Sequence, residues 1–184
     1  MILLDFFLAG LLLGLLFGGK LTRLSRVPLP FFWVVVAGFG VRFAAFGLRA
    51  SFVPLLQTFG MALVFAGTLL GIRLFGMPLV SLGAFLNFLV VLANGGRMPA
   101  SAEVAEHLGL VTIAGHLRAG RYPEYVLMGP STRLNFLGDI IPYFSFVFRR
   151  AFVASIGDYL LGVGIFLVLF HYLRKGGEDE TKDQ

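Results

Sequence analysis

Five long apolar segments, joined by short polar turns and one long loop, constrain what this chain can fold into. As a helix, each segment is about long enough to cross a hydrocarbon core of ~30 Å. Their hydrophobicity is continuous, which favours membrane helices. We predict spans at 2–19, 31–48, 53–72, 77–93 and 152–173.

The composition supports the same interpretation. The chain has 184 residues, of which 58% are hydrophobic and 14% charged, and its mean hydropathy is +0.88. A soluble domain of this size cannot bury so much apolar surface, whereas a bilayer removes the need to bury it. We predict an all-α polytopic membrane bundle of about five transmembrane helices, with 1–173 as a single transmembrane domain and 174–184 as a disordered cytoplasmic tail.

The charged residues set the expected orientation and partners. Lys20, Arg23 and Arg26 follow the first segment, and basic residues favour the cytoplasmic side. We therefore expect the N-terminus outside, the C-terminus in the cytoplasm and the 94–151 loop outside. The net charge of +5 suits membrane lipid as a partner. We expect no nucleic-acid partner, because no basic soluble module is present.

The sequence contains none of the standard motifs of several kinds of catalytic or cofactor-binding site. The chain has no cysteine, which excludes disulfides, thiol catalysis and thiolate metal sites. It contains no P-loop, dinucleotide fingerprint, Gly-x-Ser-x-Gly elbow or His-Glu-x-x-His motif. Glu103, Glu106, His107 and His116 match no metal-binding spacing, and an exposed amphipathic helix explains them equally well. We predict no metal and no cofactor, and we favour a protein without catalytic activity.

The few polar residues inside the apolar segments are predicted to converge. Successive helices alternate in direction, so these residues lie about four to six positions from the same membrane face, or ~6–9 Å deep. They are Asp5, Arg42, Gln57, Asn87 and Asp158. We predict an inward polar layer beneath the outer headgroups, with Arg42 paired to Asp158 and Asn87 beside them. The alternative is that Arg42 extends to the headgroups.

The long loop from 94 to 151 has distinct parts. Residues 99–108 predict a short helix with Ser101 as its N-cap, stopped by Gly109. Residues 110–130 show no sustained period. The apolar stretch 136–148 is too short to span, so its length indicates an interfacial or re-entrant segment.

The loop also supplies candidate ligand-binding groups. The Asn94-Gly95-Gly96 turn is expected to direct backbone amides into the polar layer, and nearby arginines suit a phosphate or carboxylate. The predicted ligand is an amphiphile (a lipid headgroup, a polyprenyl carrier or a quinone) or a partner subunit. The candidate ligand-binding residues are Arg42, Asn87, Asn94, Arg97, Arg133 and Arg149.

Asp139 and Asp158, each after a glycine, carry the alternative hypothesis of a membrane-embedded hydrolase acting on a lipid-linked substrate. Two carboxyl groups near one membrane face suit acid–base catalysis when one raises the pKa of the other. The ordinary interpretation is that each caps a helix or pairs with an arginine. A transporter subunit is a third, less favoured hypothesis, because no internal repeat is present.

Gly10, Gly14 and Gly18 recur at four-residue spacing in the first segment. Such a stripe allows another helix to approach closely. It predicts close packing with a neighbouring helix, in a homo-oligomer or a membrane complex.

Three sequence blocks carry a resemblance to a known family. They are Asn94-Gly95-Gly96-Arg97-Met98-Pro99, Leu137-Gly138-Asp139-Ile140-Ile141-Pro142 and Ser155-Ile156-Gly157-Asp158. With them, residues 1–173 resemble a family of small bacterial multi-pass membrane proteins of unknown function. The resemblance implies a multi-pass protein of the bacterial plasma membrane and no activity. A weaker similarity is to lipoprotein signal peptidases, which use two aspartates, although the residues around Asp139 and Asp158 depart from that pattern.

Overall fold

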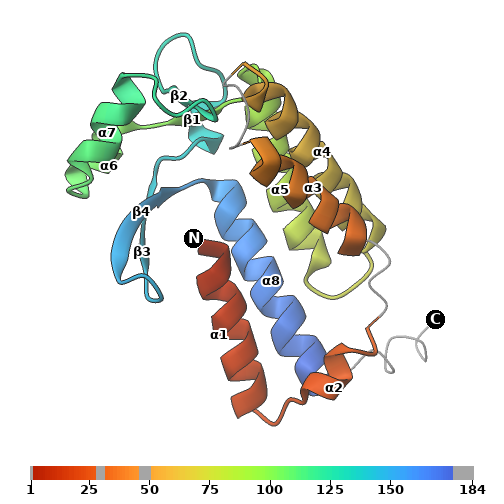
Figure 1. Cartoon of the computed structure of the whole chain (residues 1–184). Coiled ribbons are helices and arrows are strands. Elements are labelled where there is room, and N and C mark those ends of the chain that lie inside the picture. The colour runs from red at the N-terminus through yellow and green to blue at the C-terminus, as the bar shows by residue number, and fades with distance from the viewer. Residues whose placement is uncertain (1, 28–31, 46–50, 176–184) are drawn as a thin grey trace.

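The long apolar segments form helices. The computed structural model describes residues 2–27, 32–45 and 51–175, and it is mostly helical. Its long helices are α1 (Ile2–Leu16), α3 (Phe32–Ala45), α4 (Val53–Leu70), α5 (Met77–Ala93) and α8 (Ile156–Lys175), and α2 (Leu21–Leu24) is a single turn (Figure 1). The predicted span 152–173 starts too early, because 152–154 belong to a strand that precedes α8.

Two of these helices are long and apolar enough to cross a membrane. They are α4 and α8, whereas α1, α3 and α5 are apolar but shorter. By length and composition alone, two candidate spans are weak evidence for a membrane protein. The five-span arrangement expected from the sequence is therefore not established by helix length.

The helices pack in an arc. Along it α1 packs against α8, α8 against α5, α5 against α4, and α4 against α3 (Figure 1). Glycines allow the closest approaches, since a Cβ on Gly83 would lie 2.5 Å from the Gly157 carbonyl oxygen. In α1, a Cβ on Gly10 would lie 2.9 Å from the Phe166 carbonyl oxygen. The arc thus brings α5 and α8 into backbone contact and leaves α1 and α3 at its two ends.

The glycine stripe of α1 is used within the chain. Gly10 and Gly14 face α8, and a Cβ on Gly14 would lie 2.7 Å from Leu173 Cδ1. Gly18 follows the helix with a φ of +83° and has open space around it. Gly10 and Gly14 thus pack against α8 of the same chain, while association between chains through this stripe stays a prediction.

The segment that follows α5 folds over one end of the arc, and we call residues 98–154 the cap. It contains β1 (Met98–Ala100), α6 (Ala102–His107), α7 (Val111–Arg118), β2 (Tyr125–Leu127), the 3-10 helix η1 (Asn135–Leu137), β3 (Ile141–Ser145) and β4 (Arg150–Ala154). β1 pairs in parallel with β2, and β3 pairs antiparallel with β4. Figure 1 shows α6 and α7 beside this strand region and the β3–β4 hairpin descending next to α1.

Two predictions within the cap differ in outcome. The short helix with Ser101 as its N-cap is confirmed as α6, because the Ser101 hydroxyl accepts a hydrogen bond of 3.2 Å from the Val104 amide. The interfacial or re-entrant position of the stretch 136–148 stays a prediction, and the stretch forms no α-helix. It contributes the end of η1, strand β3 and the turn toward β4, with Pro142 and Phe144 exposed while Ser145 is buried. An apolar run shorter than a span does not distinguish a strand from a buried helix.

Candidate ligand-binding pocket

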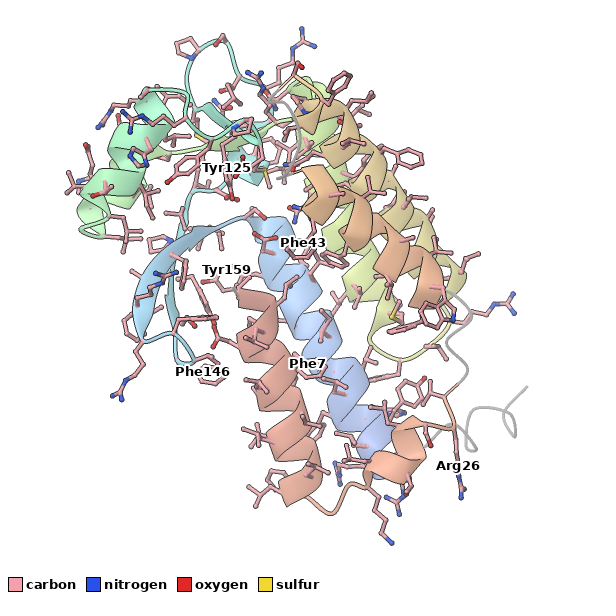
Figure 2. All side chains as sticks on the ribbon, viewed as in Figure 1. Phe7, Arg26, Phe43, Tyr125, Phe146 and Tyr159 are labelled. Atoms are coloured by element: carbon pink, nitrogen blue, oxygen red, sulfur yellow. The ribbon has the colours of Figure 1, made fainter. Side chains whose placement is uncertain are left out.

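A cavity of about 330 Å³ lies where the cap meets the arc of helices. Residues from α1, α3, α4, α5 and α8 line it together with residues of the cap. In Figure 2, Tyr125 of the cap and Phe43 of α3 lie near this junction. The polar residues that line the cavity are Arg42, Gln57, Asn87, Glu124, Tyr125, Asp139 and Asp158.

A hydrogen-bond network joins α5 to the start of α8. Asn87 Nδ2 donates to Asp158 Oδ1 at 2.7 Å, and Asn87 Oδ1 accepts from the Ser155 hydroxyl at 2.8 Å. Ser155 Oγ accepts from the Asp158 amide at 3.0 Å, and Asp158 Oδ2 accepts from the Ser155 amide at 3.2 Å. This reciprocal pattern is a capping box. The ordinary interpretation of Asp158, that it caps a helix, is therefore correct, and the same carboxylate also lines the cavity.

Arg42 reaches the cavity from α3 through a contact that depends on glycine. A Cβ on Gly60 of α4 would lie 2.6 Å from Arg42 Cγ, so only a glycine leaves room for the arginine stem. The Arg42 guanidinium lies 6.0 Å from the centre of the Phe39 ring. The expected ion pair with Asp158 does not form, since among the described residues the only ion pair joins Arg118 and Glu106. Arg42 and Asp158 therefore share a cavity without touching.

The backbone of the cap positions Asp139. Its amide donates to the Pro99 carbonyl at 2.9 Å, and its carbonyl accepts from the Ser101 amide at 3.0 Å. Gly138 makes this pairing possible, because a Cβ there would lie 2.5 Å from the Pro99 carbonyl oxygen. The blocks that contain Pro99 and Gly138-Asp139 thus meet in space, and their pairing places Asp139 in the cavity wall.

The Asp139 carboxyl group is buried and unpaired. The side chain is 8% exposed, and its Oδ1 atom has no hydrogen-bond partner among the described residues. Burial, with a smaller contribution from the negative charge of Asp158, raises the pKa of Asp139 well above its usual range, and Arg42 opposes this only in part. Burying a polar group without a hydrogen bond is costly, which marks Asp139 as a site with an unsatisfied bonding capacity.

The remaining predicted ligand-binding residues lie elsewhere. Asn94 joins two backbone segments, because its side chain donates to the Val90 and Arg133 carbonyls and accepts from the Arg133 amide. The amides of Gly95 and Gly96 bond to carbonyls at the end of α5 and are not directed into the cavity. The side chains of Arg97, Arg133 and Arg149 are exposed and do not line the cavity.

Asp5 also lies apart from the polar cavity. It is 1% exposed, and its carboxylate accepts hydrogen bonds from the Tyr143 hydroxyl and, at 3.0 Å, from the Val147 amide. Both donors belong to the β3–β4 hairpin. Gln57, by contrast, lines the cavity as expected and donates to the Glu124 carbonyl at 3.3 Å.

Sequence reasoning missed Glu124 and Tyr125. Both belong to the stretch 110–130, where no periodic pattern identified β2 or α7. They also line a second cavity of about 220 Å³ between α7 and β4, whose wall is mostly apolar. Asp139 lies in the walls of both cavities. The polar cavity therefore adjoins an apolar one within the cap.

The acidic and histidine side chains on α6 and α7 make other contacts. Glu106 forms an exposed bidentate pair with Arg118, and His116 lies 3.3 Å from the Tyr122 hydroxyl. Within 2–27, 32–45 and 51–175, no three histidine, aspartate or glutamate residues are grouped closely enough to hold a metal ion.

The fold and the cavity together define a helical protein with a capped polar pocket between its helices. The chain belongs to the Family of unknown function (DUF5317), whose model matches residues 22–170. None of the curated proteins and none of the solved structures match the chain. The match agrees with the resemblance to an uncharacterised family, and it assigns no activity.

Proposed function

We propose that the chain is a five-span protein of the bacterial plasma membrane with its cap outside. Large apolar side chains point outward along the helices, and they include Leu16, Trp33, Leu55 and Leu70, which are 66–76% exposed. Such surfaces indicate contact with lipid. Tilt or local thinning of the bilayer accommodates helices shorter than an average span. Lys20, Arg23, Arg174 and Lys175 at the opposite end favour that end as cytoplasmic.

Within this arrangement, the protein binds the polar end of a membrane amphiphile. The proposal depends on one observation, which is that a single cavity is lined by two side chains without partners. Arg42 has no ion-pair partner among the described residues, and Asp139 is buried without a hydrogen bond. A bound headgroup would supply the missing partners of both side chains. Binding energy of this kind depends on groups that are fixed in place before the ligand arrives.

The order of the helices supports entry from the bilayer. α1 and α3 stand at the two ends of the packed arc, yet both line the cavity, through Ile2 and Leu3 on one side and Phe39 and Phe43 on the other. An amphiphile can thus place its headgroup in the cavity while its chain extends between these apolar residues. A mostly apolar wall with a few placed polar groups is typical of small-molecule sites.

The charges in the cavity restrict the headgroup. Among the residues that the structure describes, Arg42 is the single basic one in its wall, against the acidic residues Glu124, Asp139 and Asp158. The other candidate arginines lie on the exposed surface. We therefore favour a headgroup that combines one anionic group for Arg42 with hydrogen-bonding hydroxyl or amino groups, over a multiply charged anion.

Lipid binding to purified protein tests this proposal. In detergent, native mass spectrometry and thermal unfolding should detect a lipid that binds the wild type, with an aminophospholipid, an anionic phospholipid and a quinone as the three probes. Arg42→Gln should weaken binding about tenfold or more, since it removes a charge-assisted hydrogen bond. Arg97→Gln, an exposed arginine outside the cavity, is the matched control. Equal binding by both variants would contradict the proposed site.

A second candidate function is hydrolysis of a lipid-linked substrate. It is favoured by Asp139 and Asp158 lining the same cavity in different surroundings, one unpaired and one hydrogen-bonded. Asp139, whose pKa is raised by burial, would protonate a leaving group, and Asp158 would take a proton from the attacking water. If cells that carry an Asp139→Asn, Asp158→Asn double variant turn over lipid-linked substrates as the wild type does, this function is excluded.

A further inference from the structure

The turn of the β3–β4 hairpin exposes apolar side chains. Phe144, Phe146, Val147 and Phe148 are 66%, 55%, 37% and 40% exposed. In the figures the hairpin descends beside α1, and Phe146 lies at its tip (Figures 1 and 2). A run of exposed aromatic residues at a turn indicates a surface that is covered in the working protein.

The two faces of the hairpin differ. Residues of β3 alternate, with Pro142 and Phe144 exposed and Tyr143 and Ser145 turned inward. Tyr143 on the inward face donates its hydroxyl hydrogen bond to Asp5 of α1. Because side chains alternate across a strand, attachment to α1 on one face directs the phenylalanines away from the protein.

Asp5 fixes the depth of the tip. It is three residues beyond the start of α1 at Ile2, or about 4.5 Å along the helix axis at 1.5 Å per residue. The Val147 amide at the tip donates to the same carboxylate at 3.0 Å. The tip is therefore held beside the first turns of a helix that we place in the membrane, below the level at which that helix begins.

Two backbone amides of the turn are hydrogen-bonded to side chains. The Val147 amide is bonded to Asp5, and the Phe148 amide donates to the Ser145 hydroxyl at 3.1 Å. In water such amides are solvated without assistance, whereas in lipid each unpaired one costs several kcal/mol. Bonding these two amides within the protein reduces the cost of placing the turn in lipid.

Two basic residues come directly after the aromatic residues in the sequence. Arg149 and Arg150 are both exposed, and the Arg150 guanidinium lies 4.7 Å from the centre of the Phe152 ring. Apolar residues next to arginines match the boundary between acyl chains and anionic phosphates. The charge pattern selects a lipid surface over a second protein as the covering partner.

We propose that the β3–β4 hairpin is a membrane-inserting element whose tip, residues 144–148, lies among the acyl chains of the outer leaflet. Asp5 holds it there, and Arg149 and Arg150 contact the phosphates. The inference rests on the proposed span of α1 and is independent of the ligand in the polar cavity. It gives the cap a second attachment to the bilayer, besides the helices.

Tryptophan fluorescence tests the depth of the tip. Trp33 in α3 is the only tryptophan of the chain, so the double variant Trp33→Phe, Phe146→Trp places one probe at the tip. In vesicles of phosphatidylglycerol and phosphatidylethanolamine, lipids brominated on their acyl chains should quench this probe strongly, and aqueous iodide should quench it weakly. Val111→Trp in the same background, at a 64% exposed position of α7, should show the reverse.

The outcomes separate the inference from the proposed spans. If iodide quenches the Phe146→Trp probe as it quenches the Val111→Trp probe, while brominated lipid quenches Trp33 of the wild type, the inserted hairpin is excluded and the spans stand. If brominated lipid quenches neither Trp33 nor the tip probe, the proposed spans and the inference both fail. Adding Asp5→Asn to the tip variant should increase iodide quenching, because Asp5 holds the tip.

Discussion

Two buried carboxyl groups, Asp5 of α1 and Asp139 of the cap, differ in their hydrogen bonding. Asp5 at the junction of α1 with the hairpin is 1% exposed and accepts hydrogen bonds from Tyr143 and Val147. Asp139 in the cavity wall is 8% exposed and has an oxygen without a partner among the described residues. Burial alone therefore does not distinguish the two, whereas hydrogen bonding does.

This difference separates a structural carboxylate from one available to a ligand. A paired buried group helps to hold two segments together, and its loss leaves its partners unsatisfied. An unpaired buried group lowers stability, so its presence beside a cavity suggests that its partner comes from elsewhere. The comparison predicts that mutations at the two sites change stability in opposite directions.

The largest effect is expected for Asp5→Ala. The substitution leaves the Tyr143 hydroxyl and the Val147 amide, both partly buried, without their acceptor. An unpaired donor that water does not reach costs about 1–3 kcal/mol. We expect the free energy of unfolding to fall by about 3 kcal/mol, measured by unfolding in mixed micelles. Asp5→Asn, which keeps one acceptor oxygen, should lose less. A stability like that of the wild type for Asp5→Ala would show that the junction contributes nothing to the fold.

An intermediate effect is expected for Asn87→Ala. It removes both hydrogen bonds that join α5 to Asp158 and Ser155, so we expect a loss of about 2 kcal/mol. Ser81→Ala is a matched control on the same helix, since the Ser81 hydroxyl is buried and has no partner among the described residues. The control should be neutral or slightly stabilising. Equal losses in both variants would mean that packing, and not the network, explains the effect.

The helices and part of the site follow from local features of the sequence. Apolar length predicts the long helices, and alternating direction predicts that Arg42, Asn87 and Asp158 come together. All three line one cavity. The predicted ion pair between Arg42 and Asp158 was wrong. The antiparallel order of the helices fixes only the height of each residue along the helix axis. It does not fix the separation of two side chains across a cavity.

The cap was less predictable because its contacts join distant residues. Asp139 reaches the cavity only when its backbone pairs with Pro99, and no local pattern encodes that pairing. The partners of Asp5 likewise depend on the register of β3 against β4, within an apolar run that does not alternate. The exposed positions of Arg97 and Arg133 follow from the turn that Asn94 organises. Residue type alone predicted that these arginines form a phosphate site, whereas the turn places their side chains on the exposed surface.

The smallest effect, and the one of opposite sign, is expected for Asp139→Asn. Because burial raises the pKa of Asp139, the folded state holds its proton at pH values where the unfolded chain has lost it. The contribution of Asp139 to the free energy of unfolding is therefore complete at pH values below its pKa in the unfolded chain. This contribution is lost as the pH rises through its higher pKa in the folded state. An uncharged asparagine removes this loss, so at pH 8 the free energy of unfolding of the variant should exceed that of the wild type by about 1 kcal/mol or less. The difference should shrink toward pH 4. A variant that is less stable at pH 8 would show that Asp139 is paired in solution, and the contrast with Asp5 would then disappear.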